Sequence, residues 1–170
     1  VGTQKVDTVN MHLIDYDENT LTEKELGNIT DGVFYKQTRS VTWININGLH
    51  DVAAIGNIGQ AFDLHPLVTE DILNTGQRPK IDDYGSYIFI VLKMIRFDRD
   101  TQKIVTEQLS IVLAETFVLT FQERPGDVFD PVRERIRRHA SRIRGCKTDY
   151  LAYVLMDTVV ENYISIIEHL

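Results

Sequence analysis

The chain of 170 residues is 43% hydrophobic and 25% charged, a composition typical of a single folded domain with a sizeable core. No stretch approaches the roughly 18 apolar residues of a membrane-spanning helix, and no basic segment followed by an apolar one predicts a signal peptide. The single cysteine, Cys146, excludes an internal disulfide bond and a cysteine-based zinc cluster.

The net charge of −7 is concentrated in the N-terminal part of the chain. Residues 1–75 contain 11 acidic and 4 basic residues, whereas residues 76–170 contain 14 of each. A protein that binds nucleic acid needs a basic face to neutralise phosphates. The acidic half therefore argues against nucleic acid as the main partner and suits cations or basic surfaces.

The N-terminal half is predicted to form strands followed by a helix. Alternating apolar residues in 9–13 predict a first strand, and a weak second strand is expected within residues 21–36. The β-branched residues 40–47 predict a third strand that ends at Gly48. Apolar residues at helical spacing then predict a helix within residues 51–64.

The rest of the chain is predicted to form a short helix, three strands and two further helices. Pro66 suits the first turn of the short helix. Pro131 opens a helix rich in arginine, and Thr148 suits the cap of a last helix that runs to Leu170. Short connectors predict antiparallel hairpins between the three strands, which are residues 87–97, 103–114 and 117–122.

This order of elements predicts an α/β (α+β) fold in one domain, residues 1–170. The expected architecture is an α-β-α sandwich with a mixed, largely antiparallel sheet, followed by a long C-terminal helix. Because the chain stops within an apolar, helix-like segment, we expect it to be a fragment of a longer protein. Six residues are expected in or beside the central sheet: Trp43, Phe89, Val91, Leu109, Ile111 and Val118.

Asp157 stands among apolar residues of the predicted last helix. A carboxylate buried there without a partner is costly, so we expect it to face water, a partner or a cation. Glu161 and Glu168 follow at spacings that place all three acids on one helix face. This pattern is explained either by a solvated acidic stripe or by a face that accepts divalent cations.

Glu70 and Asp71 form a pair of carboxylates on the predicted short helix. Adjacent helical residues point about 100° apart, so the two can serve different sites. Hard cations such as magnesium prefer carboxylate oxygens and keep most of their waters. The alternative explanation is that acids stabilise the first turn of a helix through its dipole.

Other residue combinations give weaker evidence for a transition-metal site or a catalytic site. His50 and His65 lack a second histidine or cysteine at ligand spacing, so structural or capping roles are expected. No Gly-x-Ser-x-Gly elbow supports a Ser/His/Asp assignment, and no catalytic residue is predicted. A metal-dependent hydrolase built on Glu70, Asp71 and Asp157 stays open as a weaker alternative.

An arginine-rich segment supports a different class of function. Residues 133–147 contain seven bases and one acid, Glu134. Alone, the segment suits RNA or anionic lipid. No aromatic residues interleave with the arginines for base stacking, so a solvated or salt-bridged face is the expected explanation. A soluble anion- or nucleic-acid-binding domain that uses helix 131–147 is the alternative function.

Several motifs together resemble the N-terminal cytoplasmic domain of the CorA magnesium/cobalt transporter family. They follow one another in order over about three quarters of the chain. They are Val41-Thr-Trp-Ile-Asn, Gly48-Leu-His-Asp, Leu64-His-Pro-Leu, Glu70-Asp-Ile-Leu-Asn, Gln77-Arg-Pro-Lys, Phe89-Ile-Val-Leu-Lys-Met, Asp127-Val-Phe-Asp-Pro-Val-Arg-Glu-Arg-Ile-Arg and Asp149-Tyr-Leu.

The resemblance implies a regulatory domain rather than an enzyme. Members of the family are homopentamers with a cytoplasmic funnel at the inner face of the cell membrane, and divalent cations between neighbouring funnel domains hold the pore closed. Asp71 matches a position that faces a carboxylate on the neighbouring subunit's stalk helix. Glu70 and Asp157 match positions for a second cation. The implied ion is Mg²⁺, with Co²⁺ and Ni²⁺ as alternatives.

The chain also departs from the family pattern. The Gly-Met-Asn pore signature, both membrane helices and the stalk helix are absent from the 170 residues. The resemblance therefore implies that any contact with a membrane is made through C-terminal helices outside this sequence. Each cation site would be half built in this chain alone, and the isolated fragment is not expected to form a tight pentamer.

Overall fold

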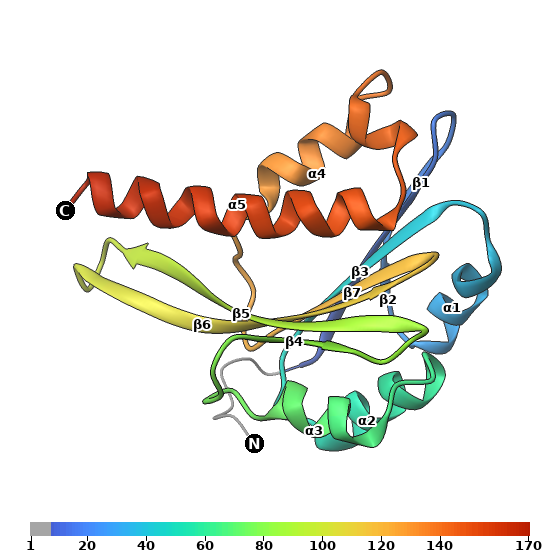
Figure 1. The fold of residues 1–170 in the computed structure, drawn as a ribbon, viewed down its shortest axis with the longest axis horizontal. Coiled ribbons are helices and arrows are strands. Elements are labelled where there is room, and N and C mark those ends of the chain that lie inside the picture. The colour runs from blue at the N-terminus through green and yellow to red at the C-terminus, as the bar shows by residue number, and fades with distance from the viewer. Residues whose placement is uncertain (1–7) are drawn as a thin grey trace.

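The computed structural model describes residues 8–170, which fold into a sheet between two layers of helices (Figure 1). The layers confirm the predicted α-β-α sandwich and its long C-terminal helix. The elements in chain order are β1 (Asn10–Tyr16), β2 (Leu21–Leu26), α1 (Thr30–Val33), the 3-10 helix η1 (Phe34–Gln37), β3 (Val41–Asn47), α2 (Val52–Ala61), α3 (Pro66–Leu73), β4 (Lys80–Asp83), β5 (Tyr87–Asp98), β6 (Lys103–Ala114), β7 (Phe117–Gln122), α4 (Asp130–Arg137), the 3-10 helix η2 (Arg142–Gly145) and α5 (Thr148–Glu168).

The described part of the chain forms one seven-stranded sheet with the order β2-β1-β3-β7-β6-β5-β4. β3 and β7 run parallel, with Trp43 opposite Val118, and the other neighbouring strands are antiparallel. The prediction of a mixed, largely antiparallel sheet is confirmed. A parallel pair needs a long crossover connection, and here that connection includes α2 and α3.

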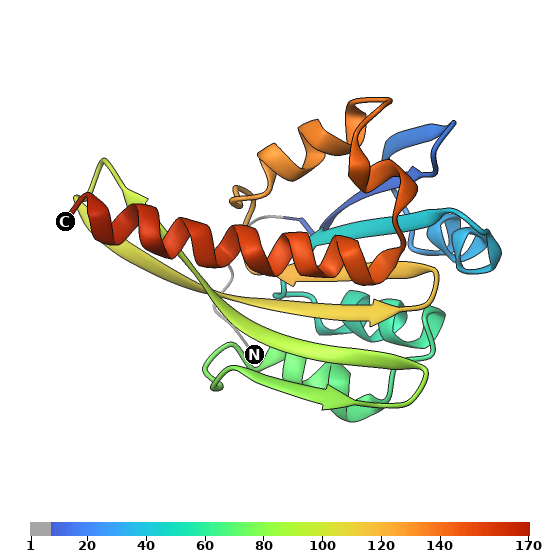
Figure 2. The same cartoon turned by 45° about the horizontal axis from the view of Figure 1, so that its top comes forward.

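The sheet separates two hydrophobic cores because successive side chains of a strand point to opposite faces. One core lies between the sheet and α2 and α3, and the other lies between the sheet and α4 and α5. Figures 1 and 2 show α5 lying along one face of the sheet and α2 and α3 on the other. All six residues predicted for the sheet lie in strands and are buried.

Local capping explains where the helices of the first core begin. The Asp51 carboxylate accepts a hydrogen bond from the Ala54 amide at 3.0 Å, which satisfies a free N–H at the start of α2. The His65 Nδ1 accepts from the Leu67 amide at 3.1 Å at the start of α3, where Pro66 occupies the first turn. The predicted capping role is therefore confirmed for His65.

One strand was missed from the sequence, and one capping prediction was wrong. The edge strand β4 was not predicted, because it has only four residues and two of them are exposed. Thr148 does not cap α5. Its buried hydroxyl donates to the carbonyls of Ala114 and Glu115, at 2.7 and 3.1 Å, and so ties the start of α5 to the end of β6.

Candidate functional site

Helix α3 holds Glu70 and Asp71 on its outer side. Val68, Ile72 and Leu73 are buried against the sheet and fix the rotation of the helix. Both acids lie in the C-terminal half of this eight-residue helix, and its first turn contains no acid. The explanation that these acids stabilise the first turn is therefore wrong, since a carboxylate near the C-terminal end is disfavoured by the helix dipole.

Asp71 is half-buried and paired with a lysine. Its Oδ2 lies 2.6 Å from Nζ of Lys80, the first residue of β4, and the same Nζ lies 3.0 Å from Oδ2 of Asp82. The hydrogen bonds to Asp71 and then to Asp82 raise the pKa of Lys80 above its usual range. Glu70 is exposed, and within residues 8–170 its side chain makes no hydrogen bond or ion pair.

Asp157 lies on α5, in the opposite helical layer. Leu151, Leu155 and Val159 bury the inner face of α5 against the sheet, whereas Asp157 is exposed. Glu161 and Glu168 are exposed as well. Four large apolar side chains are exposed on the same helix around these acids: Tyr153, Val160, Ile164 and Ile167.

The sheet therefore separates the three candidate residues within one chain. Glu70 and Asp71 lie in the layer of α2 and α3, and Asp157 lies in the layer of α4 and α5 (Figure 1). Among the described residues, no group of three or more His, Cys, Asp or Glu side chains is placed to hold a metal ion. A single hydrolase centre built on all three acids is not formed in this chain.

The carboxylate oxygens on α3 are a type of ligand that suits a hard cation, but two carboxylates are too few to complete its coordination. Carboxylate oxygens suit Mg²⁺, which binds through one or two carboxylates and keeps several waters. Glu70 and Asp71 provide such oxygens at the surface, and Asp71 is held in place by its contacts. The remaining ligands would have to come from water or from another polypeptide. Within residues 8–170, these two carboxylates do not form a complete cation site.

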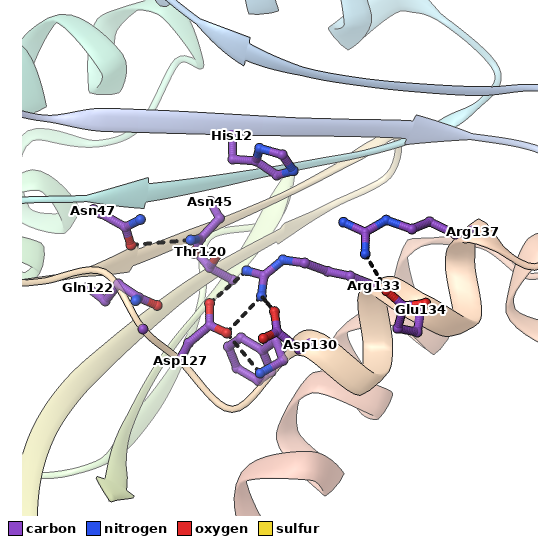
Figure 3. Close-up of polar contacts among 12 residues, drawn as sticks. His12, Asn45, Asn47, Thr120, Gln122, Asp127, Asp130, Arg133, Glu134 and Arg137 are labelled. Atoms are coloured by element: carbon purple, nitrogen blue, oxygen red, sulfur yellow. Dashed lines mark hydrogen bonds and ion pairs between the residues drawn. The ribbon is translucent and has the colours of Figure 1, made fainter. Parts of the chain in front are cut away.

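Several arginine side chains of the arginine-rich segment form hydrogen bonds and ion pairs within the chain, as Figure 3 shows for Arg133 and Arg137. Arg133 donates to both carboxylate oxygens of Asp127, at 2.8 and 2.7 Å, and to Asp130 at 3.0 Å. Its guanidinium lies 4.9 Å from the centroid of the Trp43 ring. The ion pair ties α4 to the loop before it, and the ring contact ties Arg133 to β3, so this arginine does not present a free positive charge to solvent.

Arg137 and Arg144 are also bound to distant parts of the chain. Arg137 donates to both carboxylate oxygens of Glu23, at 2.9 and 2.6 Å, and these bonds lower the pKa of Glu23 to about 2. Arg144 is buried and donates to the carbonyls of Asp17, Ile136 and Thr20. Three of the seven bases of this segment are thus engaged, which weakens the nucleic-acid alternative.

Sequence reasoning found the acids of α3 and α5 but missed Lys80. Lys80 is nine residues from Asp71, and the contact depends on β4, the strand that was not predicted. The side chains beneath α4 were missed for a similar reason. Asn45 and Thr120 lie on neighbouring strands (Figure 3). Asn45 accepts from Thr120 at 2.6 Å, and Thr120 accepts from the Trp43 indole at 2.9 Å, so the network joins two strands far apart in sequence.

Comparison with known proteins assigns the family. Residues 38–170 match the family described as CorA-like Mg²⁺ transporter protein. The chain is 46% identical over 134 residues to the cobalt/magnesium transport protein CorA of Thermotoga maritima, covering 79% of this chain and 38% of that protein. It is 30% identical over 127 residues to the putative metal ion transporter YfjQ of Bacillus subtilis, covering 74% and 37%. The chain belongs to the CorA family.

Solved structures show the same fold. The soluble domain of CorA from Methanocaldococcus jannaschii matches with a TM-score of 0.68 and 15% identity, over 94% of this chain and 59% of that one. The cytoplasmic domain of ZntB from Vibrio parahaemolyticus matches with a TM-score of 0.59 and 14% identity, over 94% and 63%. The chain thus spans less than two fifths of the curated relatives above. Within residues 8–170, no helix is long and apolar enough to cross a bilayer.

Proposed function

We propose that this chain is the cytoplasmic, divalent-cation-sensing domain of a CorA-type magnesium transporter. In this proposal the pore is formed by the part of the protein beyond these residues, and the domain lies at the inner face of the cell membrane. The domain gates the pore and is not an enzyme. The observation that carries the proposal is the pair of outward carboxylates on α3 in a member of the CorA family. They lie in the C-terminal half of the helix, where the helix dipole disfavours negative charge.

The sensing step takes place between copies of the chain. Because the sheet separates Asp157 from Glu70 and Asp71, one chain cannot gather these ligands around one ion. In a ring of five copies, Asp71 of one subunit faces a carboxylate contributed by the next. Glu70 and Asp157, on opposite layers, meet across a second contact between neighbours. Mg²⁺ is the regulatory and the transported ion, with Co²⁺ and Ni²⁺ as alternatives.

The coupling to gating is electrostatic. Two carboxylates brought to about 4 Å at a protein surface repel each other by about 4 kcal/mol before screening by salt. A dication between them converts this repulsion into an attraction that favours the closed ring. Since a ligand shifts an equilibrium only by its differential affinity for the two states, the free energy of cation binding between subunits becomes the gating free energy.

The test is protease protection of the complete transporter during a Mg²⁺ titration. Asp71→Asn keeps the shape of the side chain and removes its charge, so the protection midpoint should rise by about fivefold or more. The matched control is Asp100→Asn, because Asp100 is an exposed residue of the turn between β5 and β6. Its midpoint should equal that of the wild type. If Asp71→Asn also matched the wild type, the proposed function would be wrong.

A further inference from the structure

Asp71 is not a free carboxylate, because Lys80 already contacts one of its two oxygens, Oδ2. Lys80 begins β4, and its backbone is fixed by pairing with Val91 of β5. Its ammonium group lies over the ring of Phe89, with Nζ 5.7 Å from the ring centroid. The ammonium group then sits between Asp71 and Asp82, at 2.6 and 3.0 Å. A positive charge of the chain itself thus occupies the candidate site.

The surrounding contacts fix this arrangement. The Gln77 amide donates to the Asp71 carbonyl at 2.5 Å and to the Asn74 carbonyl at 3.0 Å, which ties the loop after α3 to the end of the helix. Lys93 donates to the Thr75 carbonyl at 3.2 Å and ties the same loop to β5. The loop that positions Lys80 beside Asp71 is therefore held by hydrogen bonds to both α3 and β5.

A cation and this lysine cannot use Asp71 in the same way. A divalent ion needs the carboxylate oxygen as a ligand, and its two positive charges repel an ammonium group in direct contact with that ligand. Asp82 offers Lys80 a second carboxylate on the same face of β4, two residues along the strand. The Lys80 side chain is about one third exposed and already contacts Asp82, so it would keep a carboxylate partner on leaving Asp71.

We propose that Lys80 is an internal counter-ion that competes with divalent cations for Asp71 and sets the cation concentration at which the domain responds. This inference rests on the proposed function. When no cation is bound, Lys80 neutralises Asp71 and lowers the repulsion between subunits. When a cation binds, Lys80 keeps only its contact with Asp82. The lysine thus weakens cation binding, and its removal should make the sensor respond to less Mg²⁺.

The experiment measures the Mg²⁺ midpoint of protease protection in the complete transporter, together with calorimetric Mg²⁺ binding, at fixed ionic strength. Lys80→Met keeps a long apolar side chain and removes the charge. A unit charge near a dication at a partly screened surface is worth about a factor of ten in affinity, so both midpoints should fall about tenfold. Lys80→Arg should stay near the wild type. Lys103→Met, which removes an exposed charge from β6, should change neither midpoint.

The double variant D71N/K80M separates this inference from the proposed function. If Lys80 acts through Asp71, K80M should lower the midpoint in the wild-type background and leave it unchanged in the D71N background. An unchanged or higher midpoint for K80M, while D71N still shifts it, overturns the inference and leaves the proposed function intact. An equal tenfold drop in both backgrounds also overturns it. A D71N midpoint equal to the wild type overturns the proposed function itself. If K80M fails to fold, Lys80→Gln replaces it in the same scheme.

Discussion

Replacing Arg133 by methionine should cost a large part of the stability of the domain. The substitution removes two charged hydrogen bonds to Asp127, whose side chain is only 4% exposed, and a cation-π contact with Trp43. Breaking a buried ion pair by removing one partner costs about 3–5 kcal/mol, because the other charge stays buried. The third bond, to Asp130, adds little, because that carboxylate is 89% exposed. We expect a loss of about 4 kcal/mol, against a total of roughly 5–15 kcal/mol for a domain of this kind.

Urea unfolding of the chain, followed by far-UV circular dichroism, measures this loss. Asp130→Asn is the matched control and should change the free energy of unfolding by no more than about 0.5 kcal/mol. The double variant R133M/D127N should lose less than the sum of the single losses, since it removes both charges of the pair. A loss below about 1 kcal/mol for R133M would contradict the conclusion that this arginine ties α4 to the loop before it and to β3, and would reopen the anion-binding alternative.

Two further predictions concern exposed or partly exposed acids. Glu23→Gln should lower the free energy of unfolding by about 0.5–1 kcal/mol at pH 7. Arg137 holds the pKa of Glu23 in the folded protein near 2, below its unfolded value. The difference in unfolding free energy should therefore persist above about pH 4.3 and disappear as the pH falls toward 2. A constant difference in urea titrations at several pH values would refute this prediction. Glu70→Gln should raise the free energy of unfolding by about 0.3 kcal/mol, because it removes a negative charge from the C-terminal half of α3, and a decrease in the urea midpoint would refute this.

The long strands could be predicted from sequence because their residues carry the signal locally. The runs that form β5, β6 and β7 are rich in β-branched and aromatic residues and are joined by short connectors, and their predicted ends differ from the observed ends by at most one residue. β4 carries no such signal. It is an edge strand of four residues that is stabilised by pairing with β5, and that pairing depends on the rest of the sheet.

The candidate site could be predicted only in part. Glu70 and Asp71 were identified by residue type, but the end of the helix on which they lie depends on where α3 stops. Lys80 reaches Asp71 only because β4 forms, and Arg137 reaches Glu23 across 114 positions of the chain. Contacts of this kind come from the tertiary fold and leave no pattern in the local sequence. That Glu70, Asp71 and Asp157 are cation ligands stays a prediction.

In the proposed function, Asp71 binds a divalent cation between two copies of the chain. The most direct measurement is the position of Co²⁺ in crystals of the proposed transporter, located by its anomalous scattering. We predict a peak beside the Asp71 carboxylate, with a carboxylate of a second copy on its other side and the Lys80 ammonium paired with Asp82 alone. Crystals with Co²⁺ bound elsewhere, no peak at Asp71 and the Asp71–Lys80 pair intact would contradict it.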